Sequence, residues 1–119
     1  MLMPIIACVD PYQAAKAYES AGWNIDFSQP PESGDPLVGV SLLGNRVLLG
    51  VTEGYLRDDE LAHIACGVEF YVTVPRKELE NVHERHRAFS PTPIRNMPWG
   101  VSVFEVSIEN HPYMIAGEG

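Results

Sequence analysis

The sequence is poor in basic residues. Lysine and arginine number 8 against 16 aspartates and glutamates, so the formal net charge is −8. Nucleic-acid binding needs a basic patch that neutralises phosphates, and here the only adjacent basic pair is Arg76-Lys77. We therefore expect no nucleic-acid partner. The excess acid favours a cationic ligand, although an acidic surface also serves solubility alone.

Long apolar runs and cysteine motifs are also lacking. No run approaches the ~20 apolar residues of a membrane span, and residues 1–7 lack the charged and long apolar regions of a signal peptide. We expect a cytoplasmic protein without a membrane partner. The two cysteines, Cys8 and Cys66, form no CxxC motif and lie in apolar contexts, which favours two buried thiols.

The chain is long enough for one compact domain. It has 119 residues, of which 45% are apolar. Half of that length, about 60 residues, would give only a marginal core of its own. Two modules of that size would have to pack on each other or on a second chain.

The stretch 98–118 predicts a β-hairpin, with Glu109-Asn110 as its polar turn. Side chains alternate between the faces of a strand. Val101, Val103 and Glu105 therefore share one face of the first strand, where a carboxylate is unusual. The stretch 38–51 predicts a similar hairpin with Gly44-Asn45 as the two-residue turn, since both residue types tolerate a positive φ.

The two hairpins belong to an internal repeat. At an offset of 65 residues a strand, a helix and a hairpin recur in one register, as the matched pairs show: Val9 with Val74, Ala14 with Leu79, Ala17 with Val82, Val38 with Val103, and Asn45 with Asn110. One offset shared by three elements predicts two copies of one module.

In the first copy, residues 4–9 predict a strand. Asp10-Pro11 then starts a helix with a capping carboxylate and a proline in the first turn, and Gly22 ends it. Residues 23–27 predict the next strand, and the Pro-, Gly- and acid-rich segment 28–36 predicts a loop. We expect a first module over 1–52, a connector over 53–66 and a second module over 67–119.

The second copy repeats this order. Residues 68–74 predict a strand, and a helix follows Pro75. His83 and His86 are spaced i, i+3 on that helix, as a metal pair can be, but the pattern supplies no third ligand, so packed helix histidines are the preferred interpretation. Pro91 and Pro93 predict a short or edge strand within 89–97.

The order strand, helix and three strands, given twice, resembles the vicinal oxygen chelate superfamily, which includes glyoxalases, bleomycin-resistance proteins and extradiol dioxygenases. The resemblance rests on four groups of residues: Val9-Asp10 with Ala17-Tyr18 and Ala21-Gly22-Trp23; Gly67 to Val74 with Leu79 and Val82 to Arg85; Trp99-Gly100 with Phe104; and Ile115 to Glu118. It implies an α+β fold of two βαβββ modules that form an open, cupped mixed β-sheet. The bleomycin-binding members are the most similar.

The resemblance also implies where metal ligands would stand in the metal-dependent members. Those positions fall on or near Met3, among Val47, Leu48 and Leu49, and on Tyr113 or Ala116, while the middle strand offers Glu69. One carboxylate cannot hold a catalytic divalent ion. We therefore expect no metal and no cofactor.

Two hypotheses follow. The first is a metal-free binding protein of the bleomycin-resistance type, without catalytic residues, that sequesters a cationic or aromatic small molecule, with an antibiotic as one candidate, in the cleft of a homodimer. Aromatic faces and carboxylates suit such a ligand, and the candidate residues are Trp99, Tyr71, Glu69, Glu105 and Tyr113. The second is a glyoxalase-, lyase- or dioxygenase-like enzyme of the same superfamily, with or without a metal, for which His63, Glu69, His83 and His111 are the candidate ligands or bases.

Overall fold

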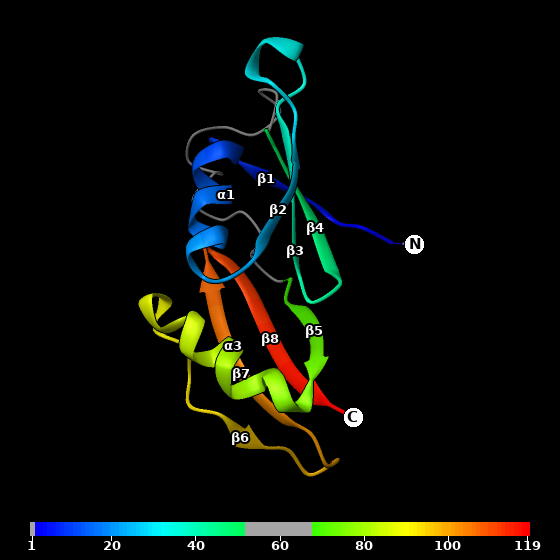
Figure 1. Cartoon of the computed structure of the whole chain (residues 1–119), viewed down its shortest axis with the longest axis vertical. Helices are drawn as coiled ribbons and strands as arrows, with labels where there is room; N and C mark the ends of the chain where they lie inside the picture. Colours follow the sequence, from blue (N-terminus) through cyan, green and yellow to red (C-terminus); the bar gives the residue numbers. More distant parts are fainter. Residues whose placement is uncertain (1, 52–67) are drawn as a thin grey trace.

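The computed structural model describes residues 2–51 and 68–119. The first half of the chain is a strand, a helix and three further strands, with a short 3-10 turn in the loop after β2 (Figure 1). Their bounds are β1 Ile5–Cys8, α1 Pro11–Ser20, β2 Asn24–Ser28, η1 Pro31–Ser33, β3 Leu37–Leu42 and β4 Asn45–Val51.

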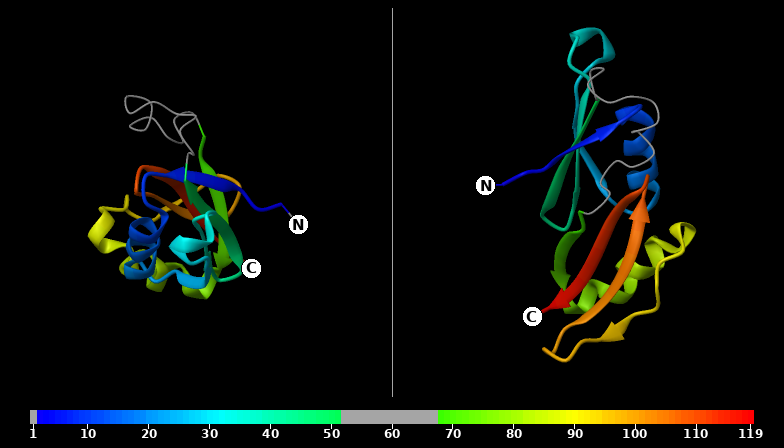
Figure 2. Two further views of the ribbon diagram at one scale, coloured as in Figure 1. Left: turned by 90° about the horizontal axis from the view of Figure 1, so that it is seen from above. Right: turned by 180° about the vertical axis from the view of Figure 1, so that it is seen from behind.

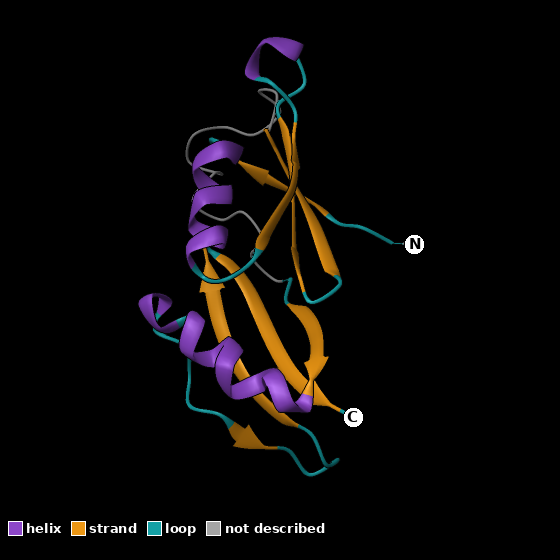
Figure 3. Ribbon diagram, in the orientation of Figure 1, coloured by secondary structure: helices purple, strands orange, loops and turns teal. Residues whose placement is uncertain are grey.

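The second half repeats this order, with its helix preceded and followed by 3-10 turns (Figure 3). The bounds are β5 Phe70–Pro75, η2 Arg76–Glu78, α3 Leu79–Arg85, η3 Arg87–Phe89, β6 Arg95–Asn96, β7 Ser102–Ile108 and β8 His111–Glu118. The predicted α+β fold of two βαβββ modules is confirmed. The predicted module boundaries stay a prediction, because residues 52–67, which include the proposed connector, His63 and Cys66, lie outside the described part.

Each module contributes one mixed four-stranded sheet. The strand orders are β1-β4-β3-β2 and β5-β8-β7-β6, with one parallel pair in each sheet, β1 with β4 and β5 with β8. Among the described strands, the two-residue β6 pairs with β7 alone and forms an edge, as the prolines before it predict.

The modules lie end to end along the longest axis, and both helices cover the same side of the two sheets (Figures 1 and 2). One apolar core runs through both modules beneath these helices. Cores shared in this way let each half bury more apolar surface than about 60 residues could bury alone. None of the helices in residues 2–51 and 68–119 is long and apolar enough to cross a membrane.

Local signals at the first helix act as predicted. The Asp10 carboxylate accepts hydrogen bonds from the backbone N–H groups of Tyr12 and Gln13, at 3.0 and 3.3 Å. The helix ends before Gly22, which has a φ of +93° that favours glycine.

The predicted turn of the first hairpin is wrong by one residue. The two residues between β3 and β4 are Leu43 and Gly44, with φ of 47° and 91°, and Asn45 begins β4. In the second hairpin the turn is Glu109-Asn110, as predicted. The strands of the modules therefore correspond at an offset of 66, one residue more than the sequence matches indicated.

Reciprocal contacts join the modules at this offset. The Asn45 side-chain amide donates to the Thr73 carbonyl on β5 at 2.8 Å, and the His111 ring lies beside Ala7 on β1. Asn45 corresponds to His111 and Ala7 to Thr73, so each hairpin tip contacts the first strand of the other module. The repeat therefore organises the junction between the two modules.

Candidate functional site

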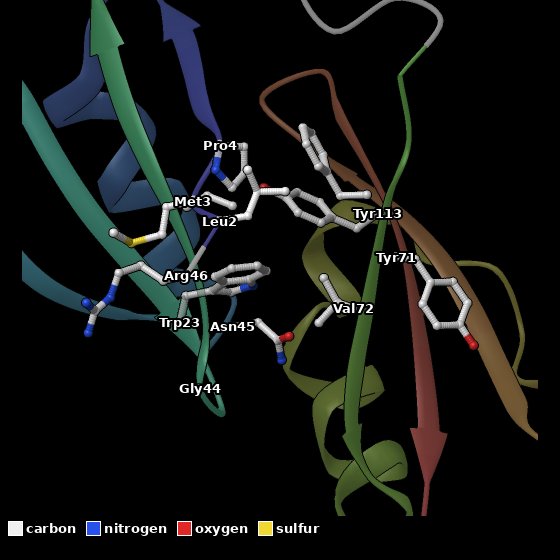
Figure 4. A pocket seen from close by; sticks show the side chains of 12 residues that line it. Leu2, Met3, Pro4, Trp23, Gly44, Asn45, Arg46, Tyr71, Val72 and Tyr113 are labelled. Carbon is white, nitrogen blue, oxygen red and sulfur yellow. The ribbon is translucent and has the colours of Figure 1, made fainter.

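A hollow of about 310 Å³ lies between the two modules (Figure 4). We call it the aromatic hollow. Its walls come from the residues before β1, from the β3–β4 turn and β4, and from β5 and β8, and its lining residues are Leu2, Met3, Pro4, Trp23, Gly44, Asn45, Arg46, Val47, Phe70, Tyr71, Val72 and Tyr113.

Aromatic rings form one wall of this hollow. The ring centroid of Tyr113 lies 5.2 Å from that of Trp23 and 5.5 Å from that of Phe70. Trp23 and Tyr113 are 2% and 1% exposed, whereas Tyr71 is 50% exposed. Aromatic pairs at these separations add stabilisation beyond that from burying their apolar surface. The hollow thus has a rigid aromatic wall in which Phe70 is partly exposed, whereas the Tyr71 side chain points away from these rings, to the other face of β5 (Figure 4).

Buried hydrogen bonds hold this wall in place. The Tyr18 hydroxyl on α1 lies 2.7 Å from the Tyr113 hydroxyl and 2.7 Å from His111 Nδ1. The Tyr18 hydroxyl and His111 Nδ1 share one hydrogen bond, whose direction depends on the tautomer of His111. Burial raises the pKa of both tyrosines and lowers that of His111 to about 4. The network is therefore uncharged at neutral pH.

A second hollow of about 320 Å³, here the acidic hollow, also borders Tyr113. It is lined by Glu69, Phe89, Ser90, Thr92, Glu105, Val106, Ser107, Pro112 and Tyr113. The Glu105 carboxylate pairs with Arg95 on β6 at 2.6 Å, with both side chains partly exposed. Part of the negative charge of this hollow is thus offset by an arginine.

Two searches by sequence find no relative, and a search by structure finds many. No protein-family model and no curated protein matches the sequence. Among solved structures, the bleomycin resistance determinant encoded on the transposon Tn5 is 11% identical to this chain, with a TM-score of 0.68 over 99% of this chain and 97% of that one. A member of the glyoxalase/bleomycin resistance protein/dioxygenase superfamily from Sphaerobacter thermophilus is 17% identical, with a TM-score of 0.67 over 99% and 97%.

The chain has the glyoxalase/bleomycin resistance fold. A lactoylglutathione lyase from Agrobacterium tumefaciens shares it as well, at 14% identity and a TM-score of 0.64 over 98% of this chain and 92% of that one. The resemblance inferred from the sequence is therefore confirmed at the level of the fold. Because binding proteins and enzymes both have this fold, function has to be argued from the site.

Most positions that the resemblance assigned to metal ligands meet in the aromatic hollow. Met3, Val47 and Tyr113 line it, whereas Glu69 lines the acidic hollow. Among the described residues, those that line the aromatic hollow include no carboxylate, imidazole or thiol. No group of three or more His, Cys, Asp or Glu side chains within residues 2–51 and 68–119 is arranged to hold a metal ion. These lining residues do not fit a catalytic divalent metal.

The structure distributes the five predicted ligand-binding residues over several places. Tyr71 and Tyr113 line the aromatic hollow, and Glu69, Glu105 and Tyr113 line the acidic one. Tyr113 is the residue that borders both. Their roles in binding stay predictions.

Trp99 lies apart from the other four. It is in the turn before β7, is 61% exposed and is not among the lining residues of either hollow. An exposure this large does not agree with a place in the packed core.

The histidines of the described part are engaged in packing. His83 Nε2 lies 2.9 Å from the Thr92 carbonyl, and its ring packs edge-on against Phe104. His86 is fully buried, and both of its nitrogens have hydrogen-bond partners: Trp23 Nε1 at 2.9 Å and the Val82 carbonyl at 2.7 Å. His83 and His86 are therefore packed helix histidines, as preferred from the sequence. His63 lies outside the described residues.

Sequence reasoning missed Trp23 and Phe70 as walls of a hollow. Trp23 appeared only as part of the motif Ala21-Gly22-Trp23, and Phe70 only as a strand residue. The repeat held a usable signal, because Trp23 lies in the short connection between the helix and the second strand of one module, near where the other module must pack. Its partners lie far along the chain, 63 residues away in the case of His86, so spacing alone could not assign them.

Proposed function

We propose that this protein binds a small aromatic or cationic molecule without a metal, in a cleft built on the aromatic hollow. The observation that carries the proposal is a hollow walled by packed rings at the positions where metal-dependent relatives of this fold are expected to hold their ion. Trp23 and Tyr113 are almost fully buried, so the partly exposed Phe70 is the ring of this wall that a flat ligand can stack on. The wall offers no ligand set for Lewis-acid chemistry.

The charge of the chain suits a cationic ligand. The net charge of −8 attracts cations from a distance, and Glu69 and Glu105 line the acidic hollow on another side of Tyr113. The fold is shared with a bleomycin resistance determinant, which supports an antibiotic as one candidate. We accordingly propose sequestration of the ligand in the cytoplasm and not its chemical conversion.

A ligand panel tests this function. The protein is purified, its metal content is measured, and its melting temperature is followed with bleomycin, other cationic aromatic compounds and glutathione adducts. A molecule that binds only the folded state at 100 times its Kd adds about 2.7 kcal/mol of stability. We expect a bleomycin-type or cationic aromatic compound to raise the melting temperature. Stoichiometric nickel, zinc, iron or manganese, or a response to glutathione adducts alone, would contradict the proposal in favour of an enzyme.

Tyr71 is the residue to change first. We expect Tyr71→Ala to weaken binding of the responding compound by about tenfold, or about 1.4 kcal/mol, because it removes the exposed ring that borders the hollow on the sheet face proposed for the homodimer cleft. The melting temperature without ligand should hardly change, since Tyr71 is half exposed. Titration calorimetry measures the affinity. Ile25→Ala is the matched control, because Ile25 is also a partly exposed strand residue but lines neither hollow. Equal affinities of Tyr71→Ala and the parent would place the ligand elsewhere.

A homodimer is part of the proposal. Ile5, Leu48, Gly39 and Phe27 form a row across the first sheet, on the face opposite the core, because the neighbouring residues Ile6, Leu49 and Val38 belong to the core. Ile5 is 67% exposed, and the corresponding residue of the second sheet, Tyr71, is 50% exposed. An apolar face of this kind usually marks an interface.

We therefore expect sedimentation at micromolar concentration to give twice the chain mass of 13.2 kDa. Ile5→Lys should shift the protein to the monomer, because it sets two charges into the contact. Val9→Lys is the control, since Val9 is also exposed but lies outside the row. A parent that sediments only as a 13.2 kDa species would remove the cleft to which Trp99 is proposed to contribute.

A further inference from the structure

The indole of Trp23 depends on one hydrogen bond from the other module. Its N–H donates to His86 Nε2 at 2.9 Å, and His86 Nδ1 lies 2.7 Å from the Val82 carbonyl. An indole nitrogen is only a donor and a carbonyl is only an acceptor. His86 must therefore be neutral and carry its hydrogen on Nδ1.

A proton added to His86 would break this arrangement. Nε2 would then carry a hydrogen that faces the indole N–H. Two N–H donors would lie at hydrogen-bonding distance with no acceptor between them, and they would repel each other. Neither ring has room to turn away. Trp23 is 2% exposed and His86 is fully buried, and the His86 ring also packs against Phe104 at a centroid distance of 5.9 Å. Relief requires Trp23 to move.

The surroundings of His86 oppose protonation. Burial lowers its pKa below the usual 6.5, and the charges of His83 and Arg85 on the same helix act in the same direction, while the bond to Val82 acts against them. From neighbouring elements His86 meets the uncharged rings of Trp23 and Phe104. Behind Trp23 stand Tyr18 and Tyr113, whose hydroxyls stay protonated.

We infer that neutral His86 is a positioning residue for the Trp23 wall of the aromatic hollow, and that acid loosens this wall and weakens ligand binding by protonating His86. The second part rests on the proposed function, because it requires that the ligand bind in that hollow. His86 itself does not line the hollow. It acts through Trp23, which does.

The first experiment needs no ligand. The chain has two tryptophans, so Trp99→Phe leaves Trp23 as the only indole. In this background we expect the emission of Trp23 to shift to longer wavelength, and its quenching by acrylamide to increase, as the pH falls from 7.5 to 4. Far-ultraviolet circular dichroism follows the secondary structure at each pH.

His86→Gln is the decisive variant, because the glutamine carbonyl can accept from the indole at the place of Nε2 but does not titrate. We expect its Trp23 emission to match the parent at pH 7.5 and to stay unchanged at the pH where the parent shifts. His86→Leu, which offers no acceptor, should show the shifted emission already at pH 7.5. His83→Gln, a change on the same helix away from Trp23, should keep the parental response.

Three results would overturn the positioning role. One is a parental pH response in His86→Gln. Another is a parental emission that stays unchanged over the whole range from pH 7.5 to 4. An emission shift that coincides with loss of the circular dichroism signal, at the same pH in the parent and in His86→Gln, would also overturn it, because acid would then simply unfold the chain.

The ligand arm uses the compound found by the panel, with bleomycin as the first probe. We expect its affinity for the parent to fall at least tenfold between pH 7.5 and the pH of the emission shift, and its affinity for His86→Gln to vary by less than threefold. Equal pH dependence in the two proteins would overturn the coupling. If no probe binds at pH 7.5, the proposed function fails by itself, and the emission measurements still decide the role of His86.

Discussion

Trp23→Ala is expected to lower the free energy of unfolding by about 3–5 kcal/mol. Trp23 is 2% exposed and packs against Tyr18, Tyr113 and His86 at the junction of the modules. The substitution leaves a cavity and removes the partner of a buried imidazole, so the loss includes an unsatisfied acceptor. Small domains have only 5–15 kcal/mol in total. Urea unfolding followed by circular dichroism measures the difference.

Trp99→Ala is the control within the same chain. Trp99 is 61% exposed, and surface substitutions away from special features usually change stability by less than about 0.5 kcal/mol. The variant should therefore unfold with the parent midpoint. If Trp99→Ala lowered the free energy of unfolding more than Trp23→Ala does, Trp23 would not be the buried tryptophan. The assignment of Trp23 to the wall of the aromatic hollow would then also be contradicted.

Stability is expected to fall by roughly 3 kcal/mol as the pH drops from 6.5 to 4, through His111 alone. In the folded state burial lowers the His111 pKa from 6.5 to about 4. The unfolded chain thus takes up a proton near pH 6.5, whereas the folded chain does so only near pH 4. Between these values the unfolded state binds more protons, so acid favours it. His86, whose pKa is also lowered by burial, acts in the same direction.

Urea unfolding at half-unit pH intervals from 7.5 to 4 measures this dependence. Replacing the titratable ring in His111→Gln should make the curve less steep over that interval, at the cost of some stability at neutral pH because Tyr18 loses its original partner. Parallel curves for the parent and His111→Gln would show that the buried ring does not titrate as inferred.

The sequence by itself determined the elements whose signals are local. Asp10 caps the first helix, Gly22 ends it, and the prolines before β6 confine that strand to an edge, because each acts through backbone geometry within a few residues. The repeated order of elements also determined the fold. The same local reasoning misplaced the first turn by one residue, because Gly44 tolerates a positive φ at either place in the turn and pairing with the other strand decides between them.

Only the tertiary structure decided which residues form the site. Trp23 meets His86 across 63 residues of chain, and Tyr18 meets His111 and Tyr113 across 93 and 95. No spacing rule reaches that far. The two tryptophans look alike as residue types, yet one is a buried wall and the other an exposed turn residue. Burial and donor–acceptor pairing between modules depend on how the two halves pack, and that packing exists only in the folded chain.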